Sequence, residues 1–400
     1  MARRAAGAIA DSPTDFGLAS VLTLVLLVMS FASVPFLLSP LLPDVAQTYG
    51  LTPAKASSSI SLFGATLAIA APLFGLFGGS LPRLLLIRSG LALFALGLFG
   101  AAFASTFSLL LLMLVITAVG AGMYVPTAYA LVGDHVPFQR RGRVMGRVMA
   151  GWGYAIILCV PLGGYLADVA GWRSAVLLLA AVAVLALFAS RLLPGGAPPG
   201  QSGLPGPNLR SLAAAVFLHP GSRLILTVNV LNMTAFYGAY TYLGTWLRTD
   251  LGMGSDGAGL VILAYGAGLA FITLNSRLLD HIGHRRSLYL SHGGLMVGWI
   301  AVALATNGPL VMLALLWVGL FQGGALVGQS TLCSHQSDHG RGAIMAFFTC
   351  TTYLGVFAGA ALFAPVFTGP GYLAVAIGAA LLNGMASVWL HFGRRRLRDA

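Results

Sequence analysis

Long apolar runs, separated by short polar or Gly- and Pro-containing segments, recur along the whole chain. A helix that spans a membrane needs about 20 mostly apolar residues. By this criterion the pattern predicts an all-α integral membrane protein with twelve transmembrane helices, at residues 18–40, 57–80, 84–104, 107–132, 145–168, 174–193, 222–247, 256–279, 286–306, 309–332, 343–368 and 370–392.

The predicted helices divide into two groups of six. The longest segment between apolar runs, residues 194–221, is rich in Pro and Gly, which is typical of a linker. The sequence RGRVM at residues 141–145 recurs as RGAIM at residues 341–345, each time before the fifth helix of its group. Such a repeat indicates two pseudo-symmetric bundles. We therefore predict an N-terminal bundle at 1–193, a cytoplasmic linker at 194–221 and a C-terminal bundle at 222–400.

Composition indicates that the chain lies in a membrane, and the distribution of charge indicates which ends of the helices face the cytoplasm. Hydrophobic residues make up 58% of the chain and charged residues 8%, whereas soluble domains have about 45–50% and about 25%. If both termini are cytoplasmic, nineteen basic residues lie inside and only Lys55, Arg173 and Arg248 lie outside, as the positive-inside rule requires. We expect a multi-pass protein of the inner membrane. The net charge of +12 does not indicate nucleic-acid binding, because the basic residues form short clusters between apolar runs.

Two segments combine turn residues with charge. At the end of the predicted fifth helix, residues 161–173 read PLGGYLADVAGWR, and Gly and Pro there allow close helix packing and bending. After the eighth helix, residues 277–286 read RLLDHIGHRR, in which Gly283 suits a tight turn. The corresponding loop of the first half lacks most of this pattern, with Gly79 in place of the Asp and Pro82 in place of the Gly.

These segments, together with the hydropathy pattern, resemble the major facilitator superfamily over nearly the whole chain. Residues 161–173 are similar to the GPxxGG element of the family's antiporters, with Val160 in place of the Gly before Pro161. Residues 277–286 are similar to the family's cytoplasmic loop signature. The resemblance implies the major facilitator fold and transport by alternating access. One departure weakens the antiporter branch: Leu114 stands where that branch often has a buried Arg.

Charged residues near helix ends are candidates for gating or coupling. We expect closure of the cytoplasmic side to depend on Asp280 with Arg143 or Arg147. Asp44, placed at the outer end of the first helix, is the strongest coupling candidate, although it could simply meet water there. His292 in the ninth helix is a weaker candidate, since that helix is peripheral in the family. The full set is Asp44, Arg143, Arg147, Asp168, Arg173, Asp280, Gly283, Arg285, Arg286 and Arg341.

Polar and aromatic residues within the helices are candidates for substrate contact. The seventh helix is unusually polar, and Asn229 and Asn232 would be costly to expose to lipid. Contact with substrate and hydrogen bonding between helices are equally good explanations of that stripe. The candidate set is Ser30, Ser33, Tyr124, Thr127, Trp152, Tyr154, Asn229, Asn232, Phe236, Tyr237, Tyr240, Trp317, Gln322, Gln329, Thr349 and Tyr353.

An uncharged cavity lined by rings and amides suits a small neutral or amphiphilic solute. We therefore favour an efflux transporter, with proton coupling left open. The alternatives are a facilitator or importer of a neutral metabolite such as a sugar, and a membrane scaffold without transport. An enzyme is disfavoured because the chain has no Glu and no HExxH or GxSxG element. We expect no cofactor, no metal and a monomer in the bilayer.

Overall fold

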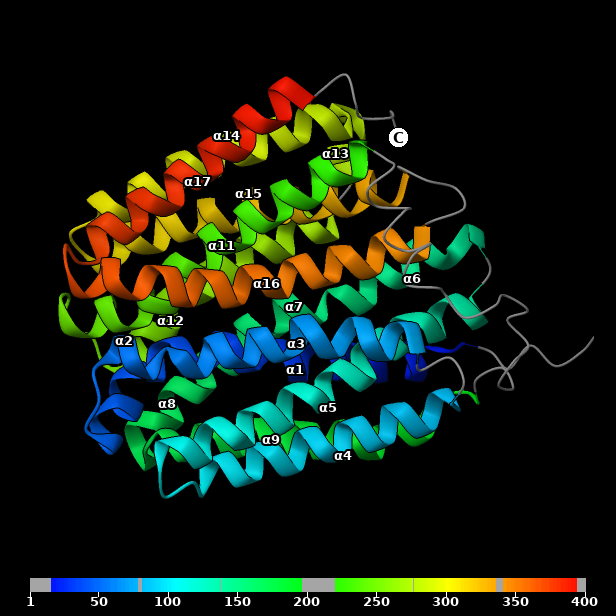
Figure 1. Cartoon of the computed structure of the whole chain (residues 1–400), viewed down its shortest axis with the longest axis horizontal. Helices are drawn as coiled ribbons and strands as arrows, with labels where there is room; N and C mark the ends of the chain where they lie inside the picture. Colours follow the sequence, from blue (N-terminus) through cyan, green and yellow to red (C-terminus); the bar gives the residue numbers. More distant parts are fainter. Residues whose placement is uncertain are drawn as a thin grey trace, which may run out of the picture.

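The computed structural model describes residues 16–77, 81–136, 138–195, 220–275, 277–335 and 341–393. Twelve long helical segments run through these ranges, roughly parallel to one another (Figure 1). The first six consist of α1 (Leu18–Tyr49), α3 (Ser58–Phe77), α4 (Arg83–Ala102), α5 (Phe107–His135), a composite fifth helix and α9 (Trp172–Ala189). The composite helix joins α6 (Phe138–Met149), α7 (Gly151–Tyr154), a π-helical turn at Ala155–Cys159 and α8 (Val160–Ala170).

The second six are α11 (Pro220–Thr249), α12 (Ser255–Leu274), α14 (His284–Leu304), α15 (Gly308–His335), α16 (Arg341–Thr368) and α17 (Tyr372–Gly393). Short helical pieces connect some of them: α2 (Pro53–Ala56), a 3-10 turn at Ser190–Leu192 and α13 (Arg277–Ile282). The twelve predicted helices are confirmed, with shifted ends. We call the end of the molecule that holds the described chain ends the terminal end, and the opposite end the distal end (Figure 1).

The first helix differs most from its prediction, because it continues to Tyr49 through three prolines. A proline removes the backbone hydrogen bond to the carbonyl four residues earlier, and a membrane helix tolerates this where another group replaces the bond. For Pro40 the freed carbonyl is that of Phe36, which accepts a hydrogen bond from the Tyr240 hydroxyl at 3.2 Å. Asp44 therefore lies within the last two turns of α1 rather than after its end.

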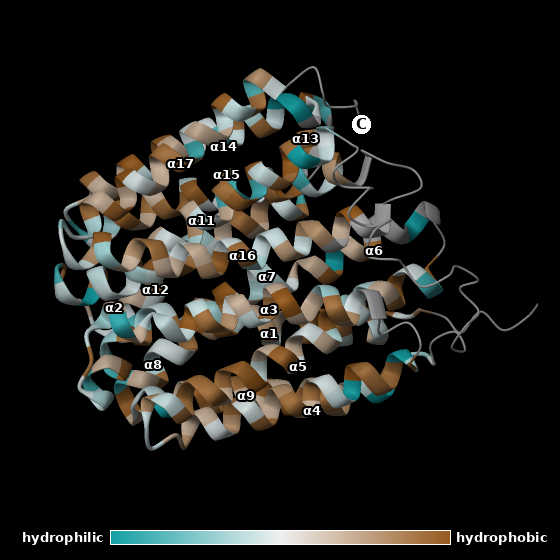
Figure 2. Ribbon diagram, viewed as in Figure 1, coloured by the Kyte–Doolittle hydropathy of each residue, from teal (hydrophilic) through white to brown (hydrophobic). Residues whose placement is uncertain are grey.

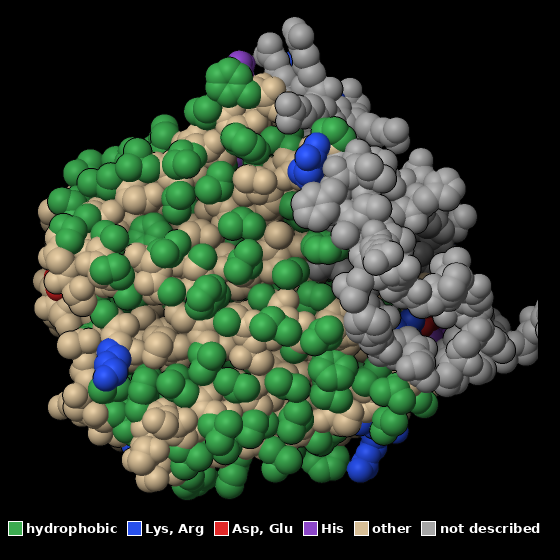
Figure 3. All heavy atoms as spheres, viewed as in Figure 1, with side chains coloured by type: hydrophobic (Ala, Val, Ile, Leu, Met, Phe, Trp, Pro, Cys, Tyr) green, Lys and Arg blue, Asp and Glu red, His purple; other side chains and the backbone are tan. Residues whose placement is uncertain are grey.

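The exterior of the molecule is apolar between its two ends. Eleven helices in the described ranges are long and apolar enough to cross a membrane. Brown, hydrophobic positions cover the outer helices in Figure 2, and hydrophilic residues concentrate near the two ends. In Figure 3 hydrophobic side chains cover the visible face, and the Lys and Arg side chains lie near its ends. The chain is therefore a multi-pass integral membrane protein.

The seventh long helix, α11, is the exception to this apolar character. Its side chains from Asn232 to Leu247 are all buried inside the protein. A helix surrounded by other helices can carry Asn, Thr and Tyr because their polar atoms meet protein partners rather than lipid. The polarity of α11 therefore reflects its central position.

Helices α1 to α9 form one group and α11 to α17 another, which we call the first and second bundles (Figure 1). Three helix pairs form most of the contact between the bundles: α1 with α11, α3 with α16, and α8 with α12. The linker predicted at 194–221 lies almost entirely outside the described residues, so the exact division of the chain remains a prediction.

Close helix packing within the first bundle depends on small residues. α4 and α5 cross where Gly90 faces Gly120, and a Cβ atom added at Gly120 would lie 2.6 Å from the Gly90 carbonyl oxygen. We expect Gly120→Ala to lower the free energy of unfolding by about 1–3 kcal/mol, because overpacking forces the helices apart. Thermal unfolding of the purified protein measures this.

The matched control is Gly133→Ala on the same helix, where an added Cβ has no neighbour within 4 Å. Its unfolding temperature should be unchanged or slightly higher, since Ala favours the helix more than Gly does. Equal unfolding temperatures for the two variants would contradict the close contact at Gly120.

Candidate functional site

Aromatic side chains from both bundles meet in the middle of their interface. The ring of Phe36 on α1 lies 5.1 Å from that of Tyr240 and 6.1 Å from that of Tyr237, both on α11. Phe236 stacks on Tyr265 of α12 at 5.0 Å. We call this group the aromatic cluster; its members are Phe31, Phe36, Trp152, Phe236, Tyr237, Tyr240, Tyr265 and Tyr353.

Helix periodicity explains how α11 contributes three rings. Phe236 and Tyr240 are four residues apart, so they lie on the same face of the helix, and Tyr237 is adjacent to that face. The centroid distances fall in the range in which ring pairs add about 0.5–1.5 kcal/mol beyond area burial. The cluster contains no charged side chain. It therefore offers π faces and phenol hydroxyls to a bound molecule.

On the distal side of this cluster, backbone groups of α1 and α11 contact directly. Ser39 donates a hydrogen bond to the Tyr240 carbonyl at 2.6 Å and accepts one from the Gly244 amide at 3.3 Å. A Cβ atom at Gly244 would lie 2.4 Å from Cα of Pro40, so only glycine permits this approach. These contacts close the distal side of the aromatic cluster.

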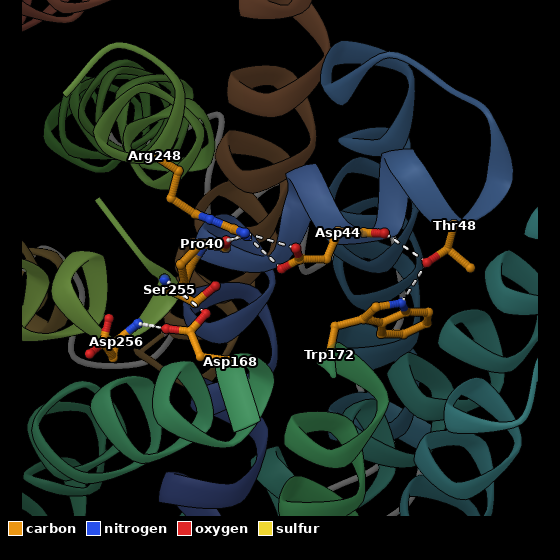
Figure 4. Close-up of polar contacts among 8 residues, drawn as sticks. All are labelled: Pro40, Asp44, Thr48, Asp168, Trp172, Arg248, Ser255 and Asp256. Carbon is orange, nitrogen blue, oxygen red and sulfur yellow. Dashed lines mark hydrogen bonds and ion pairs between the residues drawn. The ribbon is translucent and has the colours of Figure 1, made fainter. Parts of the chain in front are cut away.

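An ion pair lies one helical turn further out (Figure 4). Both carboxylate oxygens of Asp44 accept hydrogen bonds from the guanidinium of Arg248, with Oδ1 2.8 Å from Nη2. Arg248 also donates to the Pro40 carbonyl at 2.9 Å. The pair is partly buried, and its two-pronged geometry ties α1 to α11. Asp44 is thus paired with a cation of the other bundle.

Asp168 makes the second distal connection, between α8 and α12 (Figure 4). Its carboxylate accepts hydrogen bonds from the backbone amides of Ser255 at 3.1 Å and Asp256 at 2.8 Å. These amides begin α12, and a carboxylate is favourable at the positive end of a helix dipole. Gly164 allows the approach, because a Cβ there would lie 2.5 Å from the Ser255 carbonyl oxygen. The motif at 161–173 therefore brings α8 against the start of α12.

Arg173 binds within the first bundle rather than between bundles. It donates to the Ala104 carbonyl at 3.2 Å, and its guanidinium lies 4.7 Å from the centroid of the Trp172 ring. A further hydrogen bond between the bundles joins the Ser57 hydroxyl to the Tyr242 hydroxyl at 2.8 Å. This contact was not predicted from the sequence.

At the terminal end, Arg83 pairs with Asp134 at 2.9 Å. This pair holds the start of α4 against the end of α5, where the first-half loop lacks its expected Asp. Gly283 has φ +85°, as a tight turn before α14 requires. Arg147 and Arg286 are exposed, and Arg285 is half-buried. The side chains of Arg143, Asp280 and Arg341 lie outside the described part of the structure, so a contact between Asp280 and α6 remains a prediction.

Several residues predicted to contact substrate form hydrogen bonds within the protein, either to a neighbouring helix or to their own helix. Asn229 donates to the Phe348 carbonyl at 3.1 Å and to the hydroxyls of Thr351 and Thr352 at 2.9 Å. Asn232, Gln322 and Gln329 lie in a buried polar network of the second bundle. Ser30 contacts the Tyr124 hydroxyl at 3.0 Å, and Ser33, Thr127 and Thr349 each donate to a backbone carbonyl four residues earlier.

Of the other residues predicted to contact substrate, five belong to the aromatic cluster and two do not. Trp152, Phe236, Tyr237, Tyr240 and Tyr353 belong to it, as described above. Trp317 is 44% exposed and donates to the Gly294 carbonyl at 2.8 Å, on the side of α15 next to α14. Tyr154 is 39% exposed. The structure brings neither residue to the aromatic cluster.

Sequence reasoning missed three rings of the cluster, Phe31, Phe36 and Tyr265. They lie in strongly apolar runs, where an aromatic residue resembles ordinary core. One signal was available for Phe36, since Pro40 four residues later frees its carbonyl for a partner. Arg248 was also missed. The signal for it was its predicted depth, because Asp44 and Arg248 were both placed at the outer ends of their helices and carry opposite charges.

Twelve membrane helices in two bundles that meet across a central interface are an architecture typical of membrane transporters. The model of the Major Facilitator Superfamily matches residues 18–360. An uncharacterized MFS-type transporter, YwfA of Bacillus subtilis, is 32% identical over 388 residues, which are 95% of this chain and 93% of that protein. The chain belongs to the major facilitator superfamily, a family of transporters and not of enzymes.

Two further similarities are more distant. A chloramphenicol resistance protein of Streptomyces lividans is 29% identical over 293 residues, 71% of this chain and 72% of that protein. The crystal structure of the human organic anion transporter MFSD10 (TETRAN) superimposes with a TM-score of 0.74 at 18% identity, covering 93% of this chain and 98% of that one. The latter similarity shows the fold alone.

The distal ion pair provides a test of bundle closure. Thr241 on α11 is fully buried, and a cysteine there, in a background without the three natural cysteines, reports opening through its rate of maleimide labelling. We expect Asp44→Asn to increase that rate about fivefold, the effect of losing roughly 1 kcal/mol from the closed state.

Asp134→Asn serves as the control, because it breaks the ion pair with Arg83 inside the first bundle and at the other end. It should leave the labelling rate unchanged. If both substitutions accelerated labelling equally, the Asp44–Arg248 pair would have no specific part in distal closure.

Proposed function

We propose that this protein is a secondary transporter that moves a small, neutral or amphiphilic, ring-containing organic solute across the inner membrane. The observation that carries the proposal is the aromatic cluster, which takes residues from α1, α7, α11, α12 and α16 and so from both bundles. A solute bound there would contact both moving halves, as alternating access requires. The absence of charge among the cluster residues argues against inorganic ions and dianions as cargo.

The mechanism follows from the kinds of contact on each part of the interface. Opening the distal end requires the bundles to break the Asp44–Arg248 pair and the bonds from Asp168 to the start of α12. Ring contacts in the cluster are less directional, and a solute with π faces can replace them. Binding of such a solute would lower the free energy needed to separate the bundles, because its rings restore the contacts that separation removes.

The orientation that we propose places the distal end outside. It is supported by the excess of basic residues in the loops predicted to be cytoplasmic. Lys55, Arg173 and Arg248, the three basic residues predicted outside, come from three different connections of the distal end. Both termini would then be cytoplasmic.

For the direction of transport we propose efflux. The similarity to a chloramphenicol resistance protein supports it, since resistance by a membrane protein of this family is most simply export of the compound. A neutral aromatic amphiphile also partitions into the bilayer, from which an exporter can take it up.

The experiment is flux of neutral aromatic compounds, chloramphenicol among them, in proteoliposomes. We expect Tyr237→Ala and Phe236→Ala each to reduce flux about tenfold, because each removes a buried ring worth more than 1 kcal/mol of contact. Trp317→Ala is the matched control, since it removes a ring of α15 that lies outside the cluster and is 44% exposed.

Flux that is reduced equally by Trp317→Ala would mean that the cluster has no special role. Flux of a simple sugar but of no aromatic compound would contradict the proposed cargo. If no compound in the panel were transported or bound, transport itself would be in question.

A further inference from the structure

A polar network is buried inside the second bundle, and the hydrogen bonds among its members stay within that bundle. It consists of His292 on α14, Asn383 on α17, Asn232 on α11, and Gln322 and Gln329 on α15. Each of these side chains is at most 1% exposed. Five polar side chains at this depth are costly unless they pair with one another. Their arrangement shows how one of them can take up a proton.

A backbone carbonyl fixes the orientation of the network. The side-chain nitrogen of Asn383 donates to the Ala379 carbonyl at 2.9 Å, which can only accept. The Asn383 oxygen therefore faces Nδ1 of His292 at 3.1 Å and also accepts from Asn232 at 3.2 Å. Because that oxygen is an acceptor, Nδ1 of His292 carries a hydrogen. The other ring nitrogen decides the charge of the imidazole.

Nε2 of His292 lies 3.3 Å from the side-chain nitrogen of Gln329, which is a donor. Nε2 accepts this bond through its lone pair, so the imidazole shown here is neutral. The Gln329 oxygen, Oε1, is buried and has no hydrogen-bond partner in the described part of the chain. A half-turn of the Gln329 amide would place that oxygen opposite Nε2, where it would accept a hydrogen from a protonated ring.

We propose that His292 and Gln329 form a proton-binding site within the second bundle, occupied and vacated during transport. The proton from water binds the Nε2 lone pair, the bond from the Gln329 nitrogen is lost, and a bond from Nε2–H to the Gln329 oxygen replaces it. Nδ1 keeps its hydrogen bond to Asn383 throughout. The site itself is independent of the cargo, whereas its use in transport rests on the proposed function.

The surroundings favour transient rather than permanent protonation. The sequences of α11, α14, α15 and α17 contain no Asp or Glu. An imidazolium there would have dipoles around it but no carboxylate from these helices, so it would be readily released. The other titratable or charged side chains that the structure describes on these four helices are Arg223, Tyr237, Tyr240, Tyr242, Arg248, Arg285, Arg286, Tyr289, Cys333, Tyr372 and His391. The hydrogen bonds of the His292 ring go instead to Asn383 and Gln329.

The network also reaches the helix that carries the aromatic cluster. Asn232 exchanges hydrogen bonds with Gln322 at 3.0 and 3.3 Å and lies one helical turn before Phe236 on α11. A change of charge at His292 acts on Asn383, which binds Asn232 directly. Proton binding is thereby connected by side-chain contacts to a helix that both bundles use.

Histidine-selective 15N NMR of the full purified chain tests proton binding directly. His292→Gln identifies the signal, and His391→Gln, at an exposed histidine of α17, is the matched control. We expect the Nε2 resonance of His292 to move toward the protonated position as the pH falls from 7 to 3, because burial disfavours the charged ring, and Gln329→Glu to produce that state at a higher pH. A ring that stays neutral across this range in both proteins overturns the proposal.

The role in transport is measured as the response of flux to an imposed pH gradient at fixed membrane potential. We expect a gradient to change wild-type flux roughly tenfold, a typical coupling between two sites, and His292→Gln and Gln329→Met to abolish the response. Gln329→Met keeps the histidine and removes the amide with both its donor and its acceptor, so it also serves if His292→Gln fails to fold. A full response in Gln329→Met overturns the coupling role, whereas a wild type with no flux of any compound, but a titrating His292, refutes only the proposed function.

Discussion

The requirement that every polar group in the bilayer find a partner within the protein organises this structure. The pairing of Pro40 with Tyr240 is its clearest expression. The proline leaves the Phe36 carbonyl of α1 without its helical partner, and a hydroxyl from the other bundle supplies the bond. The same constraint keeps the polar helix α11 in the centre. The carbonyl that Pro40 leaves unpaired in α1 thus stabilises the contact between the two bundles.

The two kinds of contact at the interface have different consequences for movement. Directional contacts, such as the Asp44–Arg248 pair and the bonds from Asp168 to α12, connect the distal ends. They form or break as units, because an ion pair or a helix cap loses its energy within a small displacement. Ring contacts in the aromatic cluster are broader and can be exchanged for a solute. This combination suits an interface that must close firmly and yet open around a cargo.

The bundles are alike in plan and unequal in chemistry. In the first, the loop that lacks its expected Asp is compensated by the pair of Arg83 with Asp134. In the second, a histidine and four amides occupy the core. Apolar side chains would fill the same space at a lower cost in free energy. Packing alone therefore does not account for five polar side chains at this position. Within the described residues, this network of one histidine and four amides has no counterpart in the first bundle.

By itself the sequence determined the number and order of the helices, because hydropathy over about 20 residues is a local property that the bilayer imposes. It also identified α11 as a helix that must face protein, and five members of the aromatic cluster. Tertiary structure alone decided the pairings: Asp44 with Arg248, Asp168 with the start of α12, and Phe36 with Tyr240 each join residues more than 80 positions apart. Such contacts depend on the rotation and depth of each helix, which packing sets and hydropathy does not record. For the same reason the sequence left substrate contact and hydrogen bonding between helices as equal explanations of Asn229, and only the structure showed its partners on α16.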